Sequence, residues 1–204
     1  PEALAVIEGK AHQMQAPHYV CGQSYQVQSL GGTDSGEHFS FSNTHREAEH
    51  YQTPLLGQHQ VDNAGLAIQL CDLYCQSKQL PLLTKEQIDT ALLATNWPGR
   101  MEQISHQPRI ILDGAHNSHA MERLTRTLNQ HYPDLDKRIL FSCIQTKSLE
   151  EMVGQLKQVP KSQLILTSFA DPRSFSKEKM EALACEQGLN YADWQDFLEA
   201  YLKA

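Results

Sequence analysis

The 204-residue sequence lacks the features that mark membrane-spanning, secreted and disulfide-stabilised proteins. It has no run of 18 apolar residues, and its first residues carry neither the basic nor the apolar stretch of a signal peptide. Its five cysteines are spread along the chain without a Cys-x-x-Cys pair, so neither a zinc ribbon nor a disulfide framework is indicated. We therefore expect a protein of the reducing cytoplasm.

Positive charge is also scarce. The chain has 17 Lys and Arg against 24 Asp and Glu, which gives a formal net charge of −7. This balance opposes non-specific binding to nucleic acid or to an acidic membrane surface, so we expect neither as a partner. Hydrophobic residues make up 40% of the chain, as in ordinary globular proteins. The sequence opens on Pro1 rather than Met, and we expect a piece of a longer protein.

The first half of the chain predicts a mixture of helices and antiparallel strands. Residues 2–15 have a weak helical pattern, and alternating residues around a glycine-rich turn predict antiparallel strands over 18–56. Apolar residues spaced by three and four predict a helix over 63–77, with Cys71 and Cys75 on its buried face. A capping box that begins at Thr84 predicts a second helix, to about residue 94.

After residue 97 the pattern changes to strands that alternate with helices. Such alternation predicts a Rossmann-like α/β domain, in which parallel strands are joined by right-handed crossovers. We place the domain boundary near 103–108, which gives domains 1–105 and 106–204. The expected strands are 110–112, 137–144, 163–169 and a short one near 190–192. The expected helices are 118–131, 148–158, 176–187 and 194–203.

The turn that follows strand 110–112 is the most informative stretch for function. Its residues read Asp113-Gly114-Ala115-His116-Asn117. Ligands of open α/β sheets bind at the carboxyl ends of strands, where helix N-termini offer free N–H groups to anions. The turn is therefore expected to face a ligand. Capping of the loop and the helix by Asp113 and Asn117 is the structural alternative.

This turn resembles the Asp-Gly-Ala-His-Asn motif of the folylpolyglutamate synthases and bifunctional dihydrofolate synthases of the Mur ligase superfamily. Two other segments are similar to motifs of that family, in the same order along the chain. They are Leu56-Gly57-Gln58-His59-Gln60-Val61-Asp62-Asn63-Ala64 and Trp97-Pro98-Gly99-Arg100-Met101-Glu102. Ser118 stands where the family usually has Pro, and Ser can also open a helix.

Parts of the family's pattern are missing from these residues. The sequence contains no Gly-x-x-x-x-Gly-Lys-[Ser/Thr] phosphate loop, which the family carries in an N-terminal ATPase domain together with its magnesium ligands. We also expect the closing strand of the C-terminal domain to be absent. The resemblance thus implies that 1–105 is the C-terminal part of the central ATPase domain, and that 106–204 is most of the ligase domain.

The resemblance assigns a role to four residues. It implies that Asn63 lies near the adenine, Arg100 reaches the ATP phosphates, Asp113 contacts the nucleotide, and His116 acts near the phosphoryl group or the incoming glutamate. From the residues alone, Asn63 can be a helix N-cap and Arg100 a solvated hinge residue. His116 and His119 would make a poor metal pair without a carboxylate or Cys nearby, so we expect no metal site.

The resemblance implies part of an ATP-dependent amide ligase that adds L-glutamate to folates, with dihydropteroate as a second possible acceptor. It implies ATP and Mg²⁺ as cofactors of the intact enzyme, and we expect a monomer. Three alternatives stay open. The first is a Mur-type peptide ligase with a different acceptor. The second is a Rossmann-like binding module without catalysis, and the third is a protein whose helix faces serve only assembly.

Overall fold

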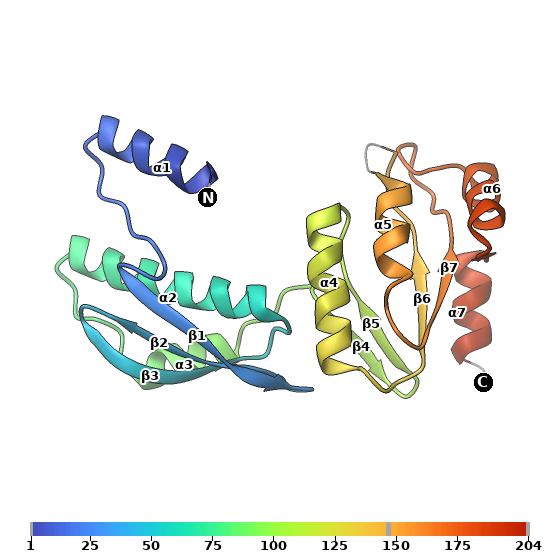
Figure 1. Ribbon diagram of the computed structural model, residues 1–204. Helices are drawn as coiled ribbons and strands as arrows, with labels where there is room; N and C mark the ends of the chain where they lie inside the picture. Colours follow the sequence, from blue (N-terminus) through green and yellow to red (C-terminus); the bar gives the residue numbers. More distant parts are fainter. Residues whose placement is uncertain (1, 146–147, 203–204) are drawn as a thin grey trace. The chain divides into compact units, whose positions relative to one another are not determined.

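The computed structural model describes residues 2–145 and 148–202 (Figure 1). The chain divides into two compact units. The first comprises Pro1–Pro54 and Gln58–Thr95, and the second comprises Leu55–Gly57 and Asn96–Ala204. The assignment of 1–105 to a central ATPase domain and of 106–204 to a ligase domain stays a prediction. No helix within the described ranges is long and apolar enough to cross a bilayer.

The first unit combines a three-stranded antiparallel sheet with helices, as the alternation over 18–56 predicts. The sheet order is β1-β2-β3, and both neighbouring pairs are antiparallel. The helix predicted from residue 63 begins earlier, at Gln58. The elements of this unit are α1 (Glu2–Gln13), β1 (Tyr25–Thr33), β2 (Gly36–Asn43), β3 (Arg46–Thr53), α2 (Gln58–Ser77) and α3 (Lys85–Leu93).

The core of the first unit lies between the sheet and the two helices that follow it. Alternate strand residues point to one face of a sheet, so β1 and β2 each offer a row of apolar side chains to the helices, and β3 offers Tyr51. The buried cluster consists of Tyr25, Phe39, Phe41, Tyr51, Val61, Ala64, Ile68 and Ile88. Cys75 is buried on α2, but Cys71 is exposed, so the prediction of a shared buried face is wrong for Cys71. The capping box is confirmed, since Thr84 and Gln87 each bond the other's backbone N–H.

Gly65 lets α2 approach β1 closely. A Cβ atom built at this position would lie 2.2 Å from Cγ2 of Val27, and the branched Val side chain has little freedom to move. We expect Gly65→Ala to lower the free energy of unfolding by about 1–3 kcal/mol, because overpacking outweighs the gain in helix propensity. Urea unfolding followed by circular dichroism measures the change.

Gly154, on the helix of the second unit that covers Leu149–Leu156, is the matched control. A Cβ atom there meets nothing within 4 Å. Gly154→Ala should therefore stabilise the chain, by up to about 1 kcal/mol. Equal stability of the two alanine variants would contradict the packing argument. Adding Val27→Ala to Gly65→Ala should restore part of the loss.

A buried ion pair ties α2 to the turn between β2 and β3. The Arg46 guanidinium donates two hydrogen bonds to the Asp72 carboxylate, at 2.8 and 2.7 Å, and a third to the Leu83 carbonyl at 2.7 Å. Asn43 donates to Asp72 at 3.0 Å and to Gln69 at 2.9 Å. The side chain of Asp72 has no exposed surface. Hydrogen bonding to Asp72 raises the pKa of Arg46 above its ordinary value.

The second unit contains a two-stranded antiparallel hairpin and a three-stranded parallel sheet. Helices α5 and α6 flank the parallel sheet (Figure 1). The mixed α/β prediction is therefore confirmed. The elements are β4 (Glu102–His106), β5 (Arg109–Leu112), α4 (Ser118–His131), β6 (Lys137–Phe141), α5 (Leu149–Leu156), β7 (Ser162–Leu166), α6 (Lys177–Gln187), β8 (Asn190–Tyr191) and α7 (Trp194–Leu202).

One prediction about this unit is wrong. Strand 110–112 was expected to be the first strand of the parallel sheet, but β5 pairs antiparallel with β4, from Glu102 opposite Leu112 to His106 opposite Arg109. Because only two residues separate the strands, β4 is the nearest partner along the chain. The prediction of a domain boundary near 103–108 contains no strand at β4. The strand is also not buried, since Leu112 is exposed.

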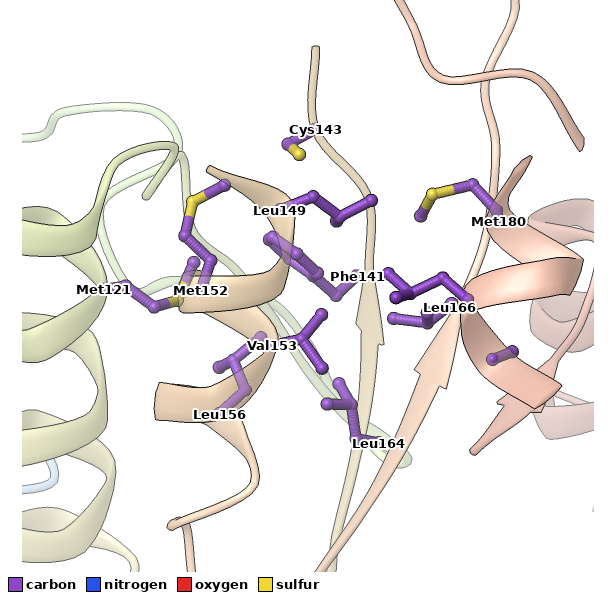
Figure 2. Close-up of a cluster of buried hydrophobic side chains, with 12 residues drawn as sticks. Met121, Phe141, Cys143, Leu149, Met152, Val153, Leu156, Leu164, Leu166 and Met180 are labelled. Carbon is purple, nitrogen blue, oxygen red and sulfur yellow. The ribbon is translucent and has the colours of Figure 1, made fainter. Parts of the chain in front are cut away.

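The core of the second unit gathers on α5 and the parallel sheet. Figure 2 shows Met152 of α5 near Met121 of α4, and Val153 beside Phe141 of β6. The buried cluster consists of Met121, Phe141, Cys143, Leu149, Met152, Val153, Leu156, Leu164, Leu166, Met180, Leu183 and Ala184. Burial raises the pKa of the Cys143 thiol to about 11. This cluster fixes α4, α5 and α6 on the sheet.

Candidate functional site

Two turns of the second unit lie against each other at the open end of the β4–β5 hairpin. The first turn, 97–101, precedes β4, and the second turn, 113–117, follows β5. The N–H of Gly114 donates to the carbonyl of Gly99 at 2.7 Å. Since Glu102 faces Leu112 in the hairpin, the residues just outside this pair are also neighbours. The hairpin register therefore brings together two segments that the sequence singles out separately.

Asp113 connects the two turns through its carboxylate. Its Oδ2 accepts a hydrogen bond from the N–H of Met101 at 3.0 Å, and its Oδ1 accepts one from the N–H of Ala115 at 2.8 Å. The side chain thus caps its own loop, which is the structural alternative given by the sequence, and it also holds the preceding turn. Each carboxylate oxygen can accept a further bond from a ligand.

His116 lies in the same turn, and its ring orientation is set by the backbone. Its Nδ1 is 2.7 Å from the carbonyl oxygen of Gly114. A carbonyl can only accept, so Nδ1 carries the proton, and Nε2 of the neutral ring is an acceptor. The exposed His116 side chain can therefore donate to a phosphate through Nε2 only as an imidazolium. Asn117 caps α4 by accepting from the N–H of Ala120 at 2.9 Å.

Arg100 is the exposed cation of the site. It lies between Gly99 and Met101, in the turn that Asp113 holds. No hydrogen bond or ion pair of its guanidinium is recorded within the described ranges. A free guanidinium presents a planar fork of donors that matches a pair of phosphate or carboxylate oxygens.

Asn63 belongs to the first unit, whereas Arg100, Asp113 and His116 belong to the second. The side chain of Asn63 is exposed, and its Nδ2 donates to Oε1 of Gln60 at 3.1 Å. Asn63 lies in the second turn of α2, so the expectation that it starts its helix as an N-cap is wrong. The helix α2 begins earlier, at Gln58, and includes Gln58, His59 and Gln60.

Residues 2–145 and 148–202 contain no group of three or more His, Cys, Asp and Glu side chains that could hold a metal ion. Nδ1 of His119 lies 4.0 Å from Oε2 of Glu122 on the exposed surface of α4. This pair alone supplies too few ligands for a metal centre.

Glu102, the last residue of the motif 97–102, also belongs to the candidate site, although the motif assigned it no role. Its Oε2 accepts a hydrogen bond from the N–H of Gly99 at 2.8 Å. The turn residues Gln107-Pro108, between the polar stretch 102–106 and the apolar run 110–112, were the available signal for a hairpin. That hairpin would have placed Glu102 beside the Asp113 turn.

Comparison with known proteins identifies the family. Residues 99–204, more than half of the chain, match the family model described as Mur ligase, glutamate ligase domain. The chain belongs to the Mur ligase family. A dihydrofolate synthase/folylpolyglutamate synthase of Bacillus subtilis is 30% identical over 183 residues, which are 89% of this chain and 42% of that protein.

Solved structures of this Mur ligase branch have the same fold. A folylpolyglutamate synthase from Thermotoga maritima is 25% identical with a TM-score of 0.80, over 98% of this chain and 46% of that one. The Mycobacterium tuberculosis folylpolyglutamate synthase complexed with ADP gives a TM-score of 0.82 at 20% identity, over 100% of this chain and 45% of that one. This Mur ligase chain therefore spans less than half the length of these relatives.

Proposed function

We propose that this chain is part of an ATP-dependent ligase that adds L-glutamate to folates, a folylpolyglutamate synthase. Synthesis of dihydrofolate from dihydropteroate is a second reaction of the same kind. Relatives that carry these names support the proposal. The observation that carries it is the Arg100 guanidinium, which has no ion-pair partner within residues 2–145 and 148–202 and extends from the turn that Asp113 holds.

The proposed reaction proceeds in two steps. A carboxylate oxygen of the folate attacks the γ-phosphorus of ATP, and the bond to the β-phosphate oxygen breaks to release ADP. The amine of L-glutamate then attacks the carbonyl carbon of the acyl phosphate. The bond from carbon to the phosphate oxygen breaks, inorganic phosphate leaves, the nitrogen loses a proton and an amide forms. Such reactions depend mainly on positioning and on stabilisation of the developing charge.

The chain's own residues act on the nucleotide and on the transferred group. Arg100 donates to phosphate oxygens and offsets their charge as the transfer proceeds. His116, as an imidazolium, donates from Nε2 to the phosphoryl group or to the incoming glutamate. Asp113 can use its remaining acceptor capacity on ribose hydroxyls, and the exposed Asn63 amide can bind an edge of the adenine.

Magnesium belongs to the proposal for the intact enzyme, but its ligands are expected elsewhere. No metal-ligand cluster exists within residues 2–145 and 148–202, so no step is assigned to a metal held by this chain. A monomer in the cytoplasm completes the proposal. An ADP complex of the Mycobacterium tuberculosis enzyme supports ATP as the nucleotide.

Two of the alternatives, the peptide ligase and the binding module, differ from the proposal in ways that can be observed. A Mur-type peptide ligase would show the same dependence on ATP but would add a different acceptor. A binding module without catalysis would come from a gene that encodes no phosphate loop upstream of Pro1 in the same reading frame. A phosphate loop there supports the ligase.

The proposal predicts that the 204-residue chain alone binds ATP weakly and does not turn it over. The sequence contains no phosphate loop, and the net charge of −7 repels the nucleotide. Calorimetric titration with ATP and Mg²⁺ measures binding. A phosphate-release assay with a folate and L-glutamate measures turnover, and the intact protein serves as the active control.

Three outcomes of these assays would count against the proposal. Turnover by the 204 residues alone would indicate a complete enzyme of another kind. A tight site for an unrelated ligand would favour the binding module. If the intact protein released phosphate with another acceptor but not with folates, it would be a Mur-type peptide ligase.

A further inference from the structure

The residues on either side of Arg100 each donate a backbone hydrogen bond to a carboxylate. On one side, the N–H of Gly99 donates to Oε2 of Glu102 at 2.8 Å. On the other side, the N–H of Met101 donates to Oδ2 of Asp113 at 3.0 Å. The two carboxylates come from opposite strands of one hairpin, since Glu102 begins β4 and Asp113 directly follows β5. Arg100 is therefore the centre of a clamped turn.

The clamped residues have an unusual backbone conformation. Both neighbours of Arg100 have positive φ angles, 69° at Gly99 and 48° at Met101. The left-handed region is unfavourable for a residue with a side chain, so the conformation of Met101 needs support from its surroundings. The bond to Asp113 and the burial of the Met101 side chain beside Leu56 supply that support.

These carboxylates do not neutralise the guanidinium beside them. Within the described residues, the hydrogen bonds of the Glu102 and Asp113 carboxylates come from backbone N–H groups. A paired arginine would have to break an ion pair before it could bind an anion. The arrangement instead fixes the backbone of Arg100 and leaves its donors for a ligand.

We propose that Glu102 and Asp113 are positioning residues, which aim the Arg100 guanidinium at the nucleotide phosphates by clamping the two residues that flank it. This inference rests on the proposed function for the identity of the anion. It assigns a role to Glu102, and it makes the orientation of Arg100 depend on the β4–β5 hairpin. An arginine on an unclamped turn would lose more backbone conformational entropy on binding.

Glu102 gives the sharper test, because Asp113 is also proposed to touch the nucleotide. In the intact enzyme, Glu102→Ala removes the acceptor of the Gly99 N–H. We expect kcat to fall by about 10- to 100-fold, the effect of a misplaced catalytic group, with a smaller change in KM for ATP. Glu102→Gln keeps an acceptor oxygen without the charge and should retain most of the rate. Glu122→Ala, which removes an exposed carboxylate on α4, should leave the rate unchanged.

A double-mutant cycle distinguishes positioning from a structural effect. If Glu102 acts through Arg100, Glu102→Ala should lower kcat by less than about threefold when Arg100→Ala is already present. Full additivity of the two losses would overturn the proposal. A Glu102→Gln variant as slow as Glu102→Ala would also overturn it, because the charge would then matter rather than the clamp.

Hydrogen–deuterium exchange tests the clamp without any reaction. In the intact protein, Glu102→Ala should speed exchange at the Gly99 amide about tenfold, while Glu122→Ala should not. Unchanged exchange would refute the clamp even if folates are substrates. Faster exchange in a protein that does not ligate glutamate to folates would leave the clamp standing and would reject the proposed function.

Discussion

Arg100→Ala in the intact protein is expected to lower the rate of the proposed glutamate addition by about two to three powers of ten, the usual effect of losing a charge-stabilising donor. Its melting temperature should change little, because an exposed charge contributes within about 0.5 kcal/mol to stability. Steady-state kinetics and thermal melts of the same preparation measure the two effects. A large kinetic loss without a stability loss would identify Arg100 as a functional residue.

Two further arginine variants make this measurement more specific. Arg100→Lys keeps the charge but loses the planar fork, so its rate should lie between those of the alanine variant and the wild type. Arg126→Ala removes an arginine that pairs with Glu122 on the surface of α4, and it should keep the full rate. If Arg100→Ala melted much earlier and kept its rate per folded molecule, Arg100 would be structural.

Asp72→Ala should produce the largest stability loss in the first unit. The variant leaves the Arg46 guanidinium buried without its ionic partner, and it removes an acceptor of Asn43. Breaking such a buried pair typically costs about 3–5 kcal/mol, because the remaining charge stays desolvated. Urea unfolding of the chain, followed by circular dichroism, measures the loss.

An exposed ion pair provides the control for Asp72. Glu122 and Arg126 pair at 2.9 Å on the surface of α4, and both side chains are more than half exposed. Surface pairs contribute about 0–1 kcal/mol, so Glu122→Ala should have a small effect. Similar losses in Asp72→Ala and Glu122→Ala would contradict the importance of burial.

Local elements were predictable where a strong local signal was present. The helix predicted over 118–131 is α4, with the same bounds, and its N-cap Asn117 is one of the two capping residues that the sequence named. The Thr84 capping box depends on residues three apart and was also predictable. Such signals act within one or two turns of helix, so they do not depend on the rest of the fold.

Pairing between strands was harder to predict. The apolar run before Asp113 indicated a strand, but not whether its partner would be parallel or antiparallel. Its partner β4 lies in a polar stretch with only one exposed apolar residue, Ile104, so its hydrophobic pattern is weak. Because only two residues connect β4 and β5, the two strands pair as an antiparallel hairpin.

The sequence by itself determined the α/β class and the motifs of the site, including Arg100, Asp113 and His116. Only the tertiary structure decided what these groups bond to. Asp113 reaches the N–H of Met101, twelve residues earlier in the chain, because the hairpin register aligns them. A slip of one residue in that register would turn Glu102 to the other face and separate the partners. The conformation of the Arg100 turn is therefore a property of the folded hairpin, which no local pattern in the sequence records.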